Sequence, residues 1–289
     1  MSMYVRQVFR LGLFRHSYSF IFSQTVRATP SPLLSLSLSP FSATGNKRAA
    51  KNLLASVAGT TVAYWYLQSN VVLADAPSSE HNFIEDPDSK VLFPRCITLC
   101  DGTKARVIGL GVRTVSFLSI KVYVVGLYIA DNDIKTLRKW KDYDKEKFLS
   151  ADDESIPLAF VDQPVEIAIR VVPVRDTNGQ HLRDGFTRAV LARMEKTDLS
   201  VDETKEILEA LTSFKALFPK SSFKAGTALV LTKQKDGSLK MEYQDKQLGI
   251  VNNSWLAKNL IMAYLAAKSP ISEKAKISIA NGLEEFLES

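Results

Sequence analysis

A long apolar stretch at residues 116–130, SFLSIKVYVVGLYIA, restricts the folds open to this chain. From Leu118 to Val124 its aliphatic side chains alternate with other residues, and this period of two predicts a β-strand. A strand of this length needs neighbouring strands to satisfy its backbone hydrogen-bonding groups, so the chain must build a sheet around it. The stretch follows GLGVR at residues 109–113, which we interpret as a glycine-rich turn carrying one arginine, Arg113.

Two Asp-Gly pairs predict hairpins, because glycine adopts the positive φ of a tight turn without steric cost. Asp101-Gly102 lies between RCITLC and KARVIGLGV, and Asp236-Gly237 lies between TALVLTK and SLKMEYQ. Residues 165–174, VEIAIRVVPV, predict one more strand. We therefore expect an antiparallel sheet.

Helices are predicted between and after the strands, where apolar residues recur every three or four positions, at 182–196, 200–218, 254–267 and 272–288. Ser200 and Glu203 form a capping box at the start of the second helix. The chain has 289 residues with 46% apolar content, enough to bury the core of one domain of about 200 residues. The expected fold class is α+β, with helices layered on one face of the sheet.

The N-terminal part of the chain has a different composition. Residues 1–74 carry seven Lys or Arg and no acidic residue, so the net charge of +6 leaves the remainder close to −1. The basic charge therefore does not indicate nucleic-acid binding. Residues 1–44 are rich in Arg, Ser and apolar side chains, as in a mitochondrial transit peptide. A disordered tail is the alternative for this segment.

Residues 52–74 form an uncharged run long enough to cross a bilayer, since about 20 helical residues span the hydrocarbon core. Basic residues precede the run and acidic residues follow it, which favours a membrane anchor with the folded domain in the intermembrane space; the matrix is the alternative. A buried or interfacial helix also fits the moderate hydrophobicity. Residues 75–89, with two prolines and several acidic residues, are predicted to be a linker.

The common enzyme motifs are missing from the sequence, which has no phosphate-binding loop, no GxSxG motif and no metal-spaced cluster. Cys96 and Cys100 lie four residues apart on a predicted strand, about 13 Å, too far for a disulfide. We interpret them as small side chains on one sheet face. His181 is the only histidine within the predicted domain, because the other two lie in the first 81 residues.

GLGVR followed by KVYVVGLYI resembles the chalcone isomerase fold, and so do the later segments IRVVPV, QHLRDGF and AGTALVLT in their order. With the N-terminal extension, the chain resembles the fungal mitochondrial branch of that family, the altered inheritance of mitochondria proteins. The resemblance covers residues 90–289. It implies an open-faced β-sandwich, in which an antiparallel sheet carries a layer of helices.

The resemblance also implies a binding cleft. In the plant isomerases the arginine of this motif binds the substrate oxyanion, and Arg113 takes that position. At the family's other polar positions this sequence departs from the pattern, because Tyr123, His181 and Arg188 stand there instead. A Ser or Thr that the family has on the penultimate helix aligns near Ala257. Flavonoid cyclisation is therefore not expected.

What the resemblance implies instead is a non-catalytic protein that binds a hydrophobic carboxylate. Heme is the favoured ligand, with propionates near Arg113 or Arg188 and His181 as an axial ligand. The alternatives are a fatty-acid carrier that uses Arg113 and the Tyr123 hydroxyl, and an isomerase or lyase that uses Arg113 with His181 as acid or base. Structural roles also remain open: Arg113 paired with an acid, His181 as a helix cap, Arg188 on a charged surface and Tyr123 in the core.

Overall fold

Seven antiparallel strands form the main sheet of the computed structural model, which describes residues 82–115 and 118–288. These strands are β3 (Cys96–Thr98), β4 (Lys104–Val115), β5 (Ile120–Ala130), β6 (Ile167–Pro173), β9 (Leu229–Lys233), β10 (Leu239–Tyr243) and β11 (Lys246–Val251). Their order across the sheet is β11-β10-β9-β6-β5-β4-β3. Two short ribbons flank the sheet, one of β1 (Phe83–Glu85) with β2 (Leu92–Pro94), the other of β7 (Thr177–Asn178) with β8 (Ser222–Phe223).

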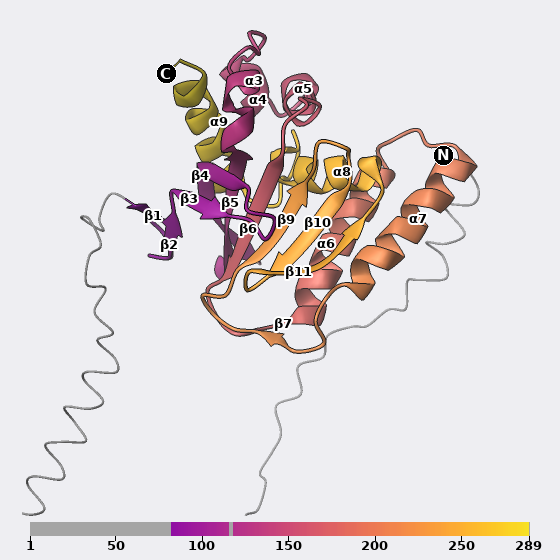
Figure 1. Cartoon of the computed structure of the whole chain (residues 1–289). Helices are drawn as coiled ribbons and strands as arrows, with labels where there is room; N and C mark the ends of the chain where they lie inside the picture. The colour runs from indigo at the N-terminus through magenta and orange to yellow at the C-terminus, as the bar shows by residue number, and fades with distance from the viewer. Residues whose placement is uncertain (1–81, 116–117, 289) are drawn as a thin grey trace, which may run out of the picture. The chain divides into compact units, whose positions relative to one another are not determined.

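The helices gather on one face of this sheet (Figure 1). The long ones are α6 (Gly179–Met194), α7 (Val201–Ala216), α8 (Ser254–Leu265) and α9 (Glu273–Glu288). The short ones are the 3-10 turn η2 (Asp131–Asp133), α3 (Ile134–Leu137), α4 (Lys145–Leu149) and α5 (Ser155–Val161). Helix α8 is buried along nearly its whole length, because it packs against α6, α7, α9 and the sheet.

Alternation along each strand divides the side chains between two cores. On β6, Ile167, Ile169 and Val171 face the helices, whereas Ala168 and Val172 face the opposite side of the sheet. That second side is covered in part by Phe93 of β2, which is fully buried. Both faces are therefore largely apolar, as expected for a strand with hydrophobic residues on both sides, and Arg170 is the one charged residue within it.

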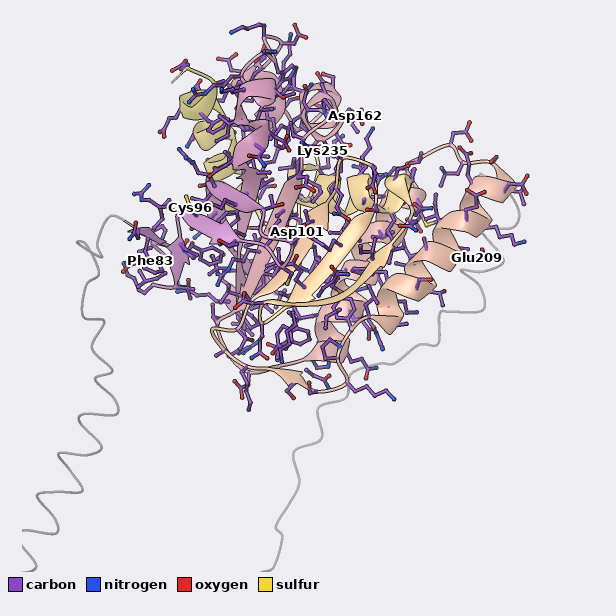
Figure 2. All side chains as sticks on the ribbon, viewed as in Figure 1. Phe83, Cys96, Asp101, Asp162, Glu209 and Lys235 are labelled. Carbon is purple, nitrogen blue, oxygen red and sulfur yellow. The ribbon has the colours of Figure 1, made fainter. Side chains whose placement is uncertain are left out.

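The second face also holds a buried ionic cluster. Lys240 of β10 is 1% exposed, and its ammonium group lies 3.1 Å from a Glu242 carboxylate oxygen and also pairs with Asp101. Asp101 lies in the turn between β3 and β4, which folds across the sheet towards β10 (Figure 2). The lysine and hydrogen bonds from Thr103 lower the pKa of Asp101 to about 2, against the opposing effect of its burial.

Residues 109–111 are not a turn, and this part of the sequence analysis is wrong. Gly109 and Gly111 lie inside β4, where α9 crosses the strand. A Cβ atom on Gly111 would lie only 2.4 Å from the backbone nitrogen of Ala275. The glycines are therefore needed for the close approach of α9, and Arg113 extends from the same strand beyond them.

The rest of the predicted architecture is largely confirmed. The domain is α+β with an antiparallel sheet and a helical layer, and both Asp-Gly pairs connect antiparallel strands. The capping box of Ser200 and Glu203 is present at the start of α7. The strand predicted at 116–130 begins at Ile120. Strand β1 precedes residue 90, so the ordered fold includes residues that composition assigned to a linker.

The N-terminal predictions fall elsewhere in the chain. The predicted transit peptide at 1–44 and anchor at 52–74 lie outside the described residues. Among residues 82–115 and 118–288, no helix has the length and hydropathy needed to cross a bilayer.

The two cysteines are both free and exposed. Cys96 lies on β3, but Cys100 lies after the strand has ended, in the turn towards β4. The absence of a disulfide is confirmed, whereas the expectation that both thiols share a sheet face is wrong, because the strand is only three residues long.

Candidate functional site: an arginine-lined pocket

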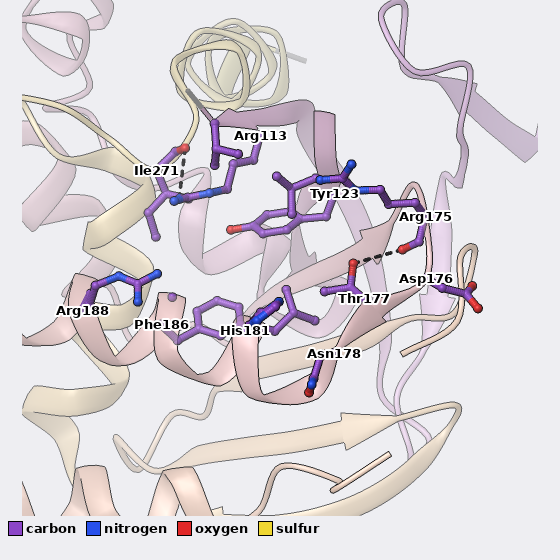
Figure 3. Close-up of a pocket in the computed structure, with 14 residues that line it drawn as sticks. Arg113, Tyr123, Arg175, Asp176, Thr177, Asn178, His181, Phe186, Arg188 and Ile271 are labelled. Atoms are coloured by element: carbon purple, nitrogen blue, oxygen red, sulfur yellow. Dashed lines mark hydrogen bonds between the residues drawn. The ribbon is translucent and has the colours of Figure 1, made fainter. Parts of the chain in front are cut away.

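A pocket of about 580 Å³ lies where the last residues of β4 and the first residues of β5 meet the start of α6. Its apolar lining comes from Val115, Val122, Leu182, Phe186 and the Tyr123 ring. Polar groups reach it from four places: the end of β4, the segment between β6 and α6, helix α6 itself, and the loop between α8 and α9 (Figure 3). The pocket therefore combines an apolar wall with several cationic side chains.

Arg113 supplies the most deeply placed of these cations. It pairs across the β4–β5 ladder with Tyr123, and its guanidinium carbon lies 5.9 Å from the centre of the tyrosine ring. Its Nη1 donates a hydrogen bond to the carbonyl oxygen of Ile271 at 3.4 Å. No carboxylate within the described residues lies within 4.0 Å of it, so an ion pair with an acid does not explain this arginine.

The Ile271 carbonyl is held in place by the surrounding backbone. The Ile271 amide donates to the carbonyl of Ala263 at 2.9 Å. The next residue, Ser272, is 5% exposed, donates its hydroxyl to the Val112 carbonyl at 2.8 Å and accepts from the Ala275 amide at 3.2 Å. The α8–α9 loop is thereby fixed to β4 beside Arg113, so one hydrogen bond orients the guanidinium group.

Tyr123 contacts a second tyrosine that the sequence analysis did not select. Its hydroxyl lies 3.0 Å from the hydroxyl of Tyr264 on α8, and both side chains are buried. Burial raises the pKa of both phenols, and the positive charge of Arg113 opposes this rise without cancelling it. The pair therefore stays protonated at neutral pH, with hydrogen-bonding capacity next to the arginine.

His181 and Arg188 lie on α6 and both line the pocket. They are seven residues apart, two helical turns, so they share a face of the helix. Both side chains are exposed, which places them at the rim (Figure 3). His181 is not the helix cap, because the side chain of Asn178 takes that role by accepting from the Gln180 amide.

Arg175 adds another cation at the rim, on the segment that leads from β6 to α6. The neighbouring Asp176 also lines the pocket, but its carboxylate is bound by Lys224 at 2.7 Å and by the Ala225 amide at 3.0 Å. The acid is thus neutralised within the protein. The electrostatic character of the pocket is positive, and an anionic group is the ligand chemistry it fits.

The structure brings all four sequence-predicted residues, Arg113, Tyr123, His181 and Arg188, to this one pocket. Ala257 does not belong to it, because that residue is fully buried in the core on α8. Sequence reasoning missed Arg175, Tyr264 and the carbonyl of Ile271. None of these carries a local signal: Tyr264 lies in a continuous apolar helix, and a carbonyl position depends on the fold.

Comparison with known proteins bears on the fold and the family. Residues 103–280 match the model of the family described as chalcone isomerase like. The protein named altered inheritance of mitochondria protein 18, mitochondrial, of Debaryomyces hansenii is 28% identical over 202 residues, which are 62% of this chain and 66% of that protein. The protein of the same name from Lachancea thermotolerans is 26% identical over 271 residues, 82% of this chain and 87% of that protein.

A solved structure shares the fold. A fatty-acid binding protein of Arabidopsis thaliana superposes with a TM-score of 0.56 at 21% identity, covering 72% of this chain and 100% of that one. At this identity the likeness establishes the architecture of the sheet and helices, and the ligand is named for the plant protein alone.

Proposed function

The chain belongs to the chalcone isomerase-like family, and we propose that its pocket binds an apolar molecule carrying a carboxylate, with a long-chain fatty acid as the leading candidate. The observation that carries this proposal is Arg113. Its half-buried side chain lies beside the apolar wall of the pocket and has no acidic partner among residues 82–115 and 118–288. A planar fork of this kind binds a carboxylate through two parallel hydrogen bonds.

The surroundings of Arg113 suit a carboxylate better than a reacting centre. The Tyr123 hydroxyl lies close to the guanidinium group and can donate to a second carboxylate oxygen. The apolar side chains of Val122, Leu182 and Phe186 provide contacts for a hydrocarbon chain. The fatty-acid ligand named for the plant structure supports this choice of class.

Heme is the second candidate, favoured by the position of His181 on the same pocket as the arginines. The donor set fits: Arg113 and Arg188 would hold the two propionates, and the exposed imidazole would be an axial ligand. Bound heme would supply an iron centre for gas or redox chemistry. The role of His181 separates the two candidates, because a fatty acid does not need it.

The test uses the full chain in lipid nanodiscs, titrated with a fluorescent long-chain fatty acid and, separately, with hemin, against empty nanodiscs. Arg113→Met keeps the apolar stem but removes the charge. Loss of one charge-assisted pair, about 1.5–3 kcal/mol, should weaken binding about 10- to 150-fold. Arg95→Met is the matched control, because Arg95 is an exposed arginine that lines a different groove.

His181→Ala then assigns the ligand. Unchanged fatty-acid affinity with a flat hemin titration identifies a fatty-acid carrier, whereas a saturable Soret shift that changes shape in His181→Ala identifies a heme protein. The proposal fails if Arg113→Met binds both ligands as tightly as Arg95→Met does.

For localisation, we propose a mitochondrial protein anchored in the inner membrane by residues 52–74, with the domain in the intermembrane space. The mitochondrial names of the fungal relatives and the charge pattern on either side of the uncharged run support this. Protease added to mitoplasts should digest the domain. Protection that is lost only on detergent lysis would place it in the matrix.

A further inference from the structure

Two large apolar side chains, those of Val115 and Leu118, are exposed to solvent at the mouth of the pocket. Val115 ends β4 and is 37% exposed, and Leu118 lies in the turn before β5 and is 67% exposed. Val115 and Val122, on the two sides of this turn, both line the pocket. We define the mouth surface as Val115, Leu118, Lys121, Arg175 and Arg188.

The charged members of the mouth surface are cations, and the one acid that lines the pocket beside them, Asp176, is paired with Lys224. Arg175 and Arg188 lie on opposite sides of the pocket in the view of Figure 3, and the described part of the chain places no carboxylate within 4.0 Å of either. Lys121, next to the turn, is exposed and donates to the backbone carbonyl of Asp88, and no carboxylate of residues 82–115 and 118–288 forms an ion pair with it. Exposed apolar side chains ringed by cations are the pattern of a surface that rests on anionic lipid headgroups.

The N-terminal part of the domain lies beside this mouth. Besides the Lys121 contact, the carboxylate of Asp88 lies 2.7 Å from the ammonium group of Lys274, two residues after Ser272 of the pocket loop. The uncharged run ends at residue 74, and only seven residues separate it from Asn82, where the described chain begins. Seven extended residues reach at most about 25 Å. A bilayer that holds the run would therefore lie within about 25 Å of Asn82, which begins the segment that carries Asp88.

We propose that the mouth surface docks on an anionic membrane, so that an apolar ligand passes between the bilayer and the pocket without crossing water. Leu118 and Val115 enter the headgroup region, and Arg175, Arg188 and Lys121 contact lipid phosphates. The docking itself does not depend on which ligand the pocket binds, so it can hold even if the proposed function fails.

The experiment places a fluorophore at the mouth of the full chain in vesicles. Cys96 and Cys100 are both exposed and are replaced by serine, after which Leu118→Cys is labelled with bimane. The vesicles contain phosphatidylglycerol and a phosphatidylcholine spin-labelled near the headgroup. Val201→Cys is the matched control, because Val201 is also an exposed aliphatic residue, 54% exposed. It lies at the start of α7, which follows the C-terminal end of α6, whereas His181 lies near the N-terminal end of α6.

We expect the spin label to quench the fluorophore at 118 several-fold more strongly than the one at 201. Arg175→Glu with Arg188→Glu should reduce quenching at 118 in these vesicles, and circular dichroism of the variant checks that it is folded. Equal quenching at the two positions, or none at 118, overturns the proposal. Quenching at 118 that the charge reversal does not change overturns the role of the arginines.

Discussion

Replacing Gly111 by alanine tests whether the distance between α9 and β4 controls both stability and the pocket. The added methyl carbon would lie 2.4 Å from the Ala275 nitrogen and 2.7 Å from the Lys274 carbonyl carbon. Unstrained carbon contacts are about 3.5–4.0 Å, so α9 must withdraw by about 1 Å or β4 must bend. Both colliding groups are backbone atoms, and no side-chain rotation relieves the contact.

The expected cost follows from that geometry. Overpacking a core costs about 1–3 kcal/mol, and we expect the upper end here because a whole helix has to move. In a domain of this size 1 kcal/mol corresponds to about 2–4 °C in melting temperature, so Gly111→Ala should lower it by about 6–12 °C. Ligand affinity should fall too, since Ser272 connects Ala275 and Val112 to the loop that bears the Ile271 carbonyl.

Gly185→Ala is the matched control for stability alone, because Gly185 itself lines the pocket and is not a control for ligand affinity. A Cβ atom at Gly185 meets nothing within 4 Å, and the residue lies inside α6. Alanine there should raise stability by about 0.5–1 kcal/mol, because glycine weakens a helix interior. Urea denaturation followed by circular dichroism measures both variants. The reasoning is refuted if Gly111→Ala stays within about 0.5 kcal/mol of the native protein, the range of ordinary surface substitutions.

Two further predictions concern buried polar groups. Tyr123→Phe and Tyr264→Phe should each cost about 1–2 kcal/mol of unfolding free energy. Tyr123→Phe should cost more, because it leaves the buried Tyr264 hydroxyl without its partner, whereas in Tyr264→Phe the Tyr123 hydroxyl still lies near Arg113. The double variant should cost less than the sum, and an additive result in the mutant cycle would contradict the pairing. Asp101 has a folded pKa of about 2, below its ordinary 3.8, so its pairing with Lys240 stabilises the fold above about pH 4 and is lost as the pH falls from about 4 to 2. With allowance for its partial exposure, the loss is about 1 kcal/mol, and acid titration of unfolding should show it in the native protein but not in Asp101→Asn.

Local sequence patterns predicted most of the fold, because the interactions that decide each element are local. Alternation identified the strand now seen at Ile167–Pro173, and the Asp101-Gly102 and Asp236-Gly237 pairs located two hairpins. The same patterns failed where a distant element decides. Gly111 looks like a turn residue in its own segment, and only the packing of α9, more than 150 residues later, shows why glycine is required within a strand.

The sequence predicted only those site residues that belong to segments resembling the family. Arg113 and Tyr123 follow from the alignment of one segment, but their relation as directly opposed residues depends on the register of β4 and β5, which includes a shift just after Arg113. The packing of α8 and its following loop brings Ile271 to the pocket and places the Tyr264 hydroxyl against that of Tyr123. No spacing in the sequence encodes that contact.

The arginines of α6 show most clearly why charge in a sequence does not identify a binding residue. Arg183, Arg188 and Arg193 look alike along the chain, and together they indicate a solvated helix face. In the fold, Arg183 pairs with Asp184, and Arg193 is buried, with one nitrogen 2.6 Å from Glu154 and another 3.1 Å from the amide oxygen of Asn259. An ion pair already made within the protein leaves little charge for a ligand. Arg188 differs because it lines the pocket and lacks an acidic partner among the described residues, so its charge is available to an anion from outside. The pairing of each cation, more than the number of cations, determines where this protein can bind a carboxylate or a lipid phosphate.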